Sequence, residues 1–454
     1  MQTPAASPKT FFGHPRGLFI LFLTEMWERF SYYGMRALLV LYMTKVIFFD
    51  GFDISKIHGL VTLKAAFESV LGPLSAIAIS SQIYGLYTGL VYLTPFFGGL
   101  IADRYIGARR AVYVGGVLMA IGHFLMAFES LFLYALLFLI LGNGFFKPNI
   151  STQVGDLYTK DDPRRDRAFT LFYMGINLGA LLSPLVCGTL GEKVGWHYGF
   201  TAAGVGMMIG LAVYHLGRRQ LPLDHLTKEE VTDQPAGPLD GEDYKRIAAL
   251  ILLCVVNILF WGVYEQQGNI LQIWSDRNVD WNVLGWTVPS TWFQAINPTL
   301  IIAFAPLLNR LWDRQNKKGR EPNSVTKMGL GCLLCALAYV LMFLVARNMG
   351  EGVLVSPLWM IATVGLFTLG ELYLSPIGLS LVTKVAPVKV VSMMMGMWFM
   401  SSFFGNYLAG YLGMYFETLG EEKFFLMLAG LVMFGAALFF VSSKPLKRII
   451  HSQG

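Results

Sequence analysis

Apolar segments long enough to cross a bilayer recur along the whole 454-residue chain. About 20 consecutive apolar residues span the hydrocarbon core as a helix. Because 55% of the residues are hydrophobic, only 14% are charged and the mean hydropathy is +0.53, the chain is predicted to be an all-α polytopic membrane protein. The twelve predicted transmembrane helices cover residues 17–47, 78–102, 109–128, 131–153, 167–190, 197–216, 246–273, 287–312, 327–347, 355–383, 390–416 and 424–442. An additional amphipathic segment at 54–70 is expected at the membrane surface.

An Asp-Arg pair followed by glycine and basic residues occurs twice, at matching places in the series of helices. Asp103-Arg104 follows the second predicted helix, and Asp313-Arg314 follows the eighth. Two copies in register indicate a repeat of six plus six helices. The predicted domains are a six-helix bundle over 1–217, a polar linker over 218–245 and a second six-helix bundle over 246–454.

Basic residues are distributed unequally between the two sides of the predicted membrane domain. The side that holds the N-terminus and every even-numbered loop carries 25 of the 35 Lys and Arg residues, whereas the other side carries seven. An excess of positive charge marks the cytoplasmic side, so both termini are expected in the cytoplasm and the protein in the cell (inner) membrane. The pI near 9.0 therefore reflects topology, and no nucleic-acid partner is expected. No cleaved signal peptide is expected either.

The first predicted helix carries four charges inside its apolar run, namely Glu25, Glu28, Arg29 and Arg36. At 3.6 residues per turn, Glu25, Arg29, Tyr32 and Arg36 line one face of the helix. Charges at this depth are costly unless they meet each other, water or a ligand. A buried structural salt bridge would explain one Glu–Arg pair, but four charges on one helix favour a wet polar cavity.

Three further ionisable residues interrupt apolar runs: Lys147, Glu265 and Glu371, on the fourth, seventh and tenth predicted helices. The first and fourth helices of each half thus carry the buried charges, as expected of a binding site at a repeat interface. Four acids face three bases, so one proton would neutralise the set. Arginine grips carboxylates and a carboxylate accepts an ammonium group. The charges therefore predict a proton-coupled carrier of a zwitterionic solute.

Neither an enzyme nor a metal protein is expected. The seven histidines (14, 58, 123, 197, 215, 225 and 451) lie mostly at helix ends or in loops, without the spacing of a catalytic or metal site. The Cys332-x-x-Cys335 pair lacks histidine partners, which favours core packing. A receptor or a channel would not need matched charged helices in both halves, so these two classes of membrane protein are disfavoured. No cofactor is expected, and the coupling ion would be the proton.

Four motifs together resemble the proton-coupled oligopeptide transporter family of the major facilitator superfamily. They are EMWERFSYYG at 25–34, GGLIADRYIG at 98–107, FTLFYMGINLGA at 169–180 and GELYLSP at 370–376. The resemblance covers nearly the whole chain. It implies the major facilitator fold, with twelve transmembrane helices in two six-helix halves. It also implies a symporter that imports di- and tripeptides with protons by alternating access, as a monomer in membrane lipid.

The resemblance implies a role for each matching residue. The residues expected to couple transport to protons are Glu25, Glu28, Arg29 and Lys147. Those expected to contact the peptide carboxylate are Tyr32, Arg36 and Lys147, and those expected to contact its amino end are Asn177, Asn297 and Glu371. Side-chain pockets are assigned to Tyr92, Trp261, Ser375 and Trp398, and binding or gating to Glu265.

A related carrier of nitrate or another small organic anion is the alternative. Loss of Glu25, Glu28 or Glu371 would favour it, and all three residues are present. Many bacterial members of the family carry two extra helices between the halves, but the segment 218–245 is too short for them. Animal members carry a proton-sensitive histidine on the second helix, where this chain has Gly85. Proton coupling is therefore expected to rest on carboxylates.

Overall fold

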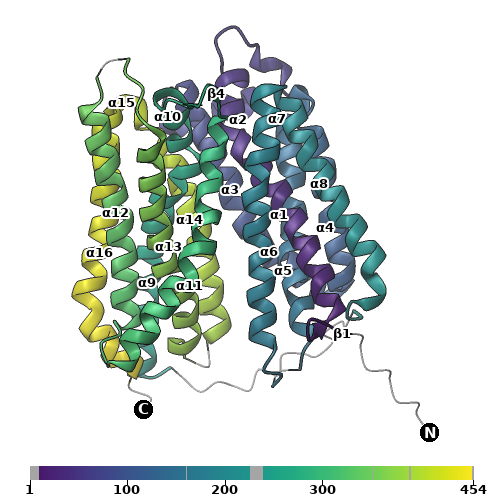
Figure 1. The fold of residues 1–454 in the computed structure, drawn as a ribbon, viewed down its shortest axis with the longest axis vertical. Helices are drawn as coiled ribbons and strands as arrows, with labels where there is room; N and C mark the ends of the chain where they lie inside the picture. The colour runs from purple at the N-terminus through teal and green to yellow at the C-terminus, as the bar shows by residue number, and fades with distance from the viewer. Residues whose placement is uncertain (1–9, 160, 225–238, 351, 388–389, 452–454) are drawn as a thin grey trace. The chain divides into compact units, whose positions relative to one another are not determined.

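The computed structural model describes residues 10–159, 161–224, 239–350, 352–387 and 390–451, with side chains described except at 379, 380, 383, 392 and 444–451. Long helices dominate these residues, and the strands form two short antiparallel hairpins (Figure 1). The predicted all-α fold class is confirmed.

The chain divides into two compact units. The first unit comprises residues 1–35 and 94–230, and the second comprises residues 36–93 and 231–454. Helix α1 (Arg16–Tyr42) contributes to both units, because the division falls inside it. These units differ from the halves predicted from the sequence in the placement of residues 36–93. The predicted linker lies partly outside the described residues, at 225–238, and the division into sequence halves stays a prediction.

The remaining helices and strands divide between the two units, and η marks short 3-10 or π segments. The first unit holds β1 (Thr10–Phe11), β2 (His14–Pro15), η3 (Ala102–Ile106), α4 (Ala108–Leu125), η4 (Glu129–Leu131), α5 (Phe132–Asp156), α6 (Arg165–Ser183), η5 (Pro184–Gly188), α7 (Thr189–Lys193), α8 (Trp196–Gly217) and η6 (Arg218–Gln220). The second unit holds η1 (Met43–Ile47), η2 (Ile54–Lys56), α2 (Leu60–Leu71), most of α3 (Ala76–Ile101), α9 (Gly241–Tyr264), η7 (Glu265–Gly268), α10 (Ile270–Asn278), β3 (Asn282–Val283), β4 (Trp286–Thr287), η8 (Ser290–Ala295), α11 (Ile296–Lys317), α12 (Ser324–Asn348), α13 (Pro357–Val385), α14 (Val391–Gly413), α15 (Phe416–Leu419) and α16 (Glu421–His451).

Each of the twelve segments predicted to cross the membrane overlaps a long helix of the described chain. Within the described residues, nine helical segments are long and apolar enough to span a bilayer by length and composition. Helix α1 is not among them, because Glu25, Glu28, Arg29 and Arg36 interrupt its apolar run. The total of twelve spans therefore stays a prediction. The amphipathic segment predicted at 54–70 corresponds to η2 and α2.

The seventh predicted span, 246–273, is interrupted in the structure. Helix α9 ends at Tyr264, the 3-10 segment η7 follows over Glu265–Gly268, and α10 begins at Ile270. Gly268 lies so close to the guanidinium of Arg36 that a Cβ atom there would come within 2.9 Å of its Nη2. The break thus brings the backbone beside a buried charge. The prediction of one continuous span over 246–273 did not include this break.

The two Asp-Arg motifs end their helices in a similar way. Asp103 and Arg104 lie in η3, and Gly107 follows with φ +83°. Asp313 and Arg314 lie in the last turns of α11, and Gly319 follows with φ +62°. A positive φ suits glycine, which lacks the Cβ that makes this conformation unfavourable. The two motifs thus share this local backbone geometry, and the repeat of six plus six helices stays a prediction.

Helices α3 and α14 of the second unit approach each other through two glycines. A Cβ atom at Gly85 would lie 2.6 Å from the Cα atom of Gly410, and a Cβ atom at Gly410 would lie 2.5 Å from the Ser81 carbonyl oxygen. Small residues allow such close backbone approach between membrane helices. Gly85, which replaces the histidine expected from the resemblance to animal family members, thus has no room for a side chain here.

Gly85→Ala is therefore expected to lower the stability of the protein by roughly 1–3 kcal/mol, the usual cost of overpacking. The measurement is thermal unfolding in detergent. Gly430→Ala on α16 is the matched control, because a Cβ atom at Gly430 would meet no heavy atom within 4 Å. Equal thermal shifts in the two variants would contradict the close approach of α3 and α14.

Candidate functional site

The first unit holds an acid–arginine cluster on α1, formed by Glu25, Glu28 and Arg29. The Arg29 Nη2 donates to Glu28 Oε1 at 2.7 Å, and its Nε lies 3.2 Å from Glu25 Oε1 and also contacts Glu28 Oε2. All three side chains are almost completely buried. One guanidinium therefore serves two carboxylates, which leaves one excess negative charge within the cluster.

Lys147 on α5 belongs to the same electrostatic environment. Its half-buried ammonium group attracts the Glu25 carboxylate. The structure therefore brings together the four residues predicted for proton coupling. Glycines allow α6 to pack directly on this part of α1, since a Cβ atom at Gly179 would lie 2.9 Å from the Arg29 Cβ atom.

Tyr32 and Asn177 differ in their relation to this cluster. The Arg29 guanidinium lies 5.2 Å from the centre of the buried Tyr32 ring, within the range of a cation–π contact. Asn177 on α6 is buried and donates from Nδ2 to the Tyr173 carbonyl oxygen of its own helix at 3.0 Å. Tyr32 is thus part of the charged environment, whereas the amide of Asn177 is bonded locally.

Asn143 is a member of this site that the sequence interpretation missed. It lies on α5, one turn before Lys147, and its Nδ2 donates to Glu28 Oε1 at 3.4 Å. The side chain is buried, and its Oδ1 has no hydrogen-bond partner among the described residues. Its spacing of four residues from Lys147 was the available signal, because residues i and i+4 share a helix face.

The second unit contains a buried ion pair between Arg36 and Glu265. The Arg36 Nη2 lies 2.5 Å from Glu265 Oε2, and its Nε donates to the Tyr84 hydroxyl at 2.8 Å. The Arg36 and Glu265 side chains are 13% and 4% exposed. Arg36 thus has a protein carboxylate as its partner in this structure, at the position predicted to hold a peptide carboxylate.

Neutralising either partner is expected to destabilise the protein by about 3–5 kcal/mol, because the other charge stays buried and unpaired. Arg36→Gln and Glu265→Gln test this by thermal unfolding without peptide, and the double variant should lose much less than the sum. The control is Lys245→Gln, whose ion pair with Glu242 is more than half exposed and should contribute little. Losses that simply add in the double variant would contradict the coupling.

A second cluster of this unit surrounds Glu371 on α13. The Tyr264 hydroxyl donates to Glu371 Oε2 at 2.5 Å, and the Asn297 Nδ2 lies 3.1 Å from the same oxygen. Asn297 also contacts the Tyr264 hydroxyl at 2.9 Å and Thr368 Oγ1 at 3.1 Å. The Glu371 cluster thus joins α9, α11 and α13, and it confirms that Asn297 and Glu371 lie together. The sequence interpretation missed Tyr264 and Thr368, which are uncharged residues in apolar helices.

The four residues predicted to line side-chain pockets all belong to the second unit. Trp261 packs edge to face on Tyr264 with ring centres 5.3 Å apart, next to the Glu371 cluster. Trp398 is buried, and a Cβ atom at Gly378 would lie 2.6 Å from its Cζ2. Tyr92 on α3 and Ser375 on α13 are half-buried. Trp261 thus contacts a residue that is hydrogen-bonded to the buried Glu371 carboxylate.

Comparison with known proteins places this arrangement in a family. The sequence model of a protein family described as the POT family matches residues 109–236 and 230–424 of this chain. The di-/tripeptide transporter of Lactococcus lactis subsp. cremoris is 33% identical over 523 residues, with 99% of both chains covered. The chain belongs to the POT family.

Two further relatives illustrate the likeness. The uncharacterized transporter YclF of Bacillus subtilis is 35% identical, with 92% of this chain and 91% of the relative covered. A crystal structure of a peptide transporter POT in complex with sulfate has a TM-score of 0.85 at 32% identity, with 98% of each chain covered. This similarity confirms the major facilitator-type fold of a membrane transporter.

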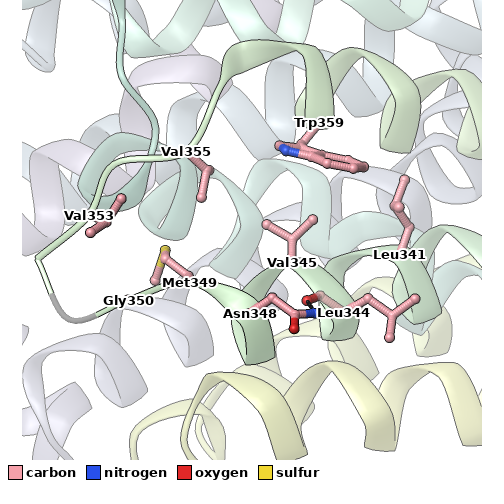
Figure 2. A pocket seen from close by; sticks show the side chains of 9 residues that line it. All are labelled: Leu341, Leu344, Val345, Asn348, Met349, Gly350, Val353, Val355 and Trp359. Carbon is pink, nitrogen blue, oxygen red and sulfur yellow. Dashed lines mark hydrogen bonds between the residues drawn. The ribbon is translucent and has the colours of Figure 1, made fainter.

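The second unit of this POT family member contains an apolar pocket whose lining includes none of the predicted site residues. The pocket has a volume of about 370 Å³ and lies beside the end of α12 and the start of α13 (Figure 2). Its lining is Leu341, Leu344, Val345, Asn348, Met349, Gly350, Val353, Val355 and Trp359. Without a charged side chain in the lining, this pocket does not offer the opposite charges that a zwitterion requires.

Proposed function

We propose that this POT family member is a proton-coupled symporter that imports di- and tripeptides by alternating access. The observation that carries the proposal is the pair of buried clusters, in which carboxylates meet arginine in one and tyrosine and asparagine in the other. Buried charges within membrane helices are costly and mark solute or proton pathways. The names of relatives, such as the di-/tripeptide transporter of Lactococcus lactis, support a peptide as the solute.

The proposed proton site is the acid–arginine cluster together with Lys147. Arg29 is shared by Glu25 and Glu28, so one proton would neutralise these three residues. The positive charge of Lys147 would then be available to a peptide carboxylate. The Glu25 Oε2 is buried and has no hydrogen-bond partner among the described residues. A proton on this oxygen would therefore displace no existing hydrogen bond.

The proposed peptide site has a cationic and an anionic pole. Arg36 and Lys147, with Tyr32, would receive the carboxylate, since guanidinium and ammonium groups bind carboxylates strongly. Arg36 would then exchange Glu265 for the peptide carboxylate, which gives Glu265 a role in gating. The amino end would be bound by Glu371 with Asn297 and Asn177. Tyr92, Trp261, Ser375 and Trp398 would contact the peptide side chains.

The remaining parts of the proposal concern cellular context. The excess of basic residues on one side supports a cell (inner) membrane location with both termini in the cytoplasm. The protein would act as a monomer in membrane lipid, as a transporter without catalytic activity. It would need the proton as coupling ion and no cofactor.

Uptake of a labelled dipeptide into proteoliposomes under an imposed pH gradient tests the proposal. Accumulation above the equilibrium level, abolished by a protonophore, is expected. If nitrate or another small anion accumulates instead and the dipeptide does not, the alternative of a related anion carrier replaces the proposal.

A further inference from the structure

The chain begins its described part with a tight hairpin in the first unit. β1 pairs with β2 through Thr10 with Pro15 and Phe11 with His14, and Figure 1 shows β1 beside the first turns of α1. The two connecting residues, Phe12 and Gly13, have φ of +47° and +78°. Two positive φ values in a two-residue loop are typical of a type I′ turn, for which Asn-Gly is the preferred sequence.

Phe12 is an unexpected residue for this turn. Bulky side chains are disfavoured at positive φ, and such an outlier is a reason to look for a function. Its side chain is also 83% exposed, so core packing does not explain it. Neither the backbone nor the protein interior accounts for a phenylalanine at this position.

The hairpin is held firmly by the loop between α5 and α6. The His14 Nδ1 and the Tyr158 hydroxyl are 2.8 Å apart, and the Arg164 Nη1 donates to the Gly13 carbonyl oxygen at 2.9 Å. Arg164 is in turn paired with Asp162 at 2.7 Å. Hydrogen bonds from the Arg164 side chain and backbone lower the pKa of Asp162 to about 2, so the Asp162 carboxylate stays charged at physiological pH. The turn is thus presented in a fixed position.

The exposed rings continue an aromatic surface of α1. The ring centre of Phe11 lies 4.4 Å from that of Phe12 and 5.0 Å from that of Phe19, which lies in the first turns of α1. Phe11 is 50% exposed, and Arg16, the first residue of α1, is exposed as well. Aromatic rings next to basic residues, at the point where a helix enters the bilayer, are typical of the membrane–water interface.

We infer that this hairpin is a membrane anchor whose Phe11 and Phe12 rings insert into the headgroup–acyl boundary of the leaflet that α1 enters. The partner is phospholipid of the surrounding membrane. Continuity with Phe19 at the start of an apolar helix supports this partner over a soluble protein. The anchor would fix the loop between α5 and α6 at the bilayer surface through His14 and Arg164. This inference depends on the membrane placement of α1 and not on the solute carried.

A fluorescent label at position 12 tests the inference in the full chain reconstituted in liposomes. The four native cysteines are buried, so Phe12→Cys can be labelled selectively with an environment-sensitive fluorophore. Phe11→Cys serves as a second variant in case the first does not fold. Thr159→Cys is the matched control, because Thr159 is exposed in the loop that holds the hairpin.

Labels at 11 and 12 are expected to be quenched by lipids with a shallow nitroxide at least about two-fold more strongly than the label at 159, and less by aqueous iodide. Nitroxides deep in the acyl chains should quench them less than shallow ones do. If iodide quenches position 12 as strongly as position 159, the anchor is absent. A label shielded from both quenchers would indicate a protein partner and would also overturn the inference.

Phe12→Asn removes the exposed ring of the anchor while keeping a residue that suits the turn. Asparagine suits the positive φ, so the hairpin is expected to persist and thermal stability in detergent to be unchanged or higher. A label at Phe11→Cys in this background should lose about half of its lipid quenching relative to Phe11→Cys alone, because the Phe12 ring that inserts beside the label is gone. Unchanged quenching would contradict a role for Phe12 in the anchor.

Discussion

Glu25→Gln and Glu28→Gln are each expected to abolish proton-driven accumulation of dipeptide while sparing part of the counterflow exchange. Glutamine keeps the shape of glutamate but does not carry a transferable proton. Counterflow needs no net proton movement, so a site that still binds peptide can continue to exchange it. The measurement is uptake in proteoliposomes with and without an imposed pH gradient.

The two substitutions are expected to differ in their effect on stability. Both oxygens of Glu28 contact Arg29, and Asn143 donates to one of them. The Glu25 Oε2, in contrast, has no hydrogen-bond partner among the described residues. Glu28→Gln should therefore lower the melting temperature more than Glu25→Gln, because it weakens more bonds to a buried guanidinium.

Asp161→Asn is the control for this experiment, because Asp161 is an exposed acid in the loop between α5 and α6. It should accumulate dipeptide like the unmodified protein. Full uphill accumulation by both glutamine variants would falsify the assignment of the proton site to the acid–arginine cluster.

The sequence predicted the helices well because their signal is local. A run of about 20 apolar residues needs no knowledge of its neighbours to be interpreted as a span. Charges inside such runs were also visible, because each is an exception to its surroundings. The family resemblance then assigned Glu25, Glu28, Arg29 and Lys147 to one site before their contacts were known.

Pairing between distant segments could not be predicted in the same way. Helical periodicity placed Arg36 on the face of Glu25 and Arg29, but its partner Glu265 is 229 residues away and lies in a 3-10 segment that interrupts a predicted span. Tyr264 and Asn143 form hydrogen bonds with carboxylates but carry no charge. They therefore did not stand out as candidate site residues within an apolar segment of the sequence. Local composition reveals buried charges, whereas the neutral groups that bind them depend on tertiary structure.

Dialanine and trialanine are expected to compete for uptake of a labelled dipeptide, whereas free alanine and tetra-alanine compete poorly. In the second unit, Arg36 offers a positive pole and Glu371 a negative one, and the two charges interact electrostatically. At roughly 3.3–3.6 Å per residue, two residues span about 7 Å and three about 10 Å. A single amino acid is too short to meet both poles, and a longer peptide places only one of its ends. Competition by alanine or nitrate equal to that of dialanine would contradict a two-pole site.

Capping the amino end of the peptide tests the negative pole directly. N-acetyl-dialanine lacks the ammonium group, so the Glu371 carboxylate would be desolvated without a charged partner, and competition should be much weaker than for dialanine. In Glu371→Gln the penalty for the acetyl group should shrink, because a neutral amide loses less when the ammonium is absent.

Asn297 and Tyr264 contact the same oxygen of Glu371. Asn297→Ala should therefore weaken the binding of dialanine while leaving most of the acetyl penalty in place. The ratio of the two half-inhibitory concentrations, measured in each variant, isolates the charge contribution from general loss of binding. An acetyl penalty of the same size in the unmodified protein and in Glu371→Gln would place the amino end of the peptide elsewhere.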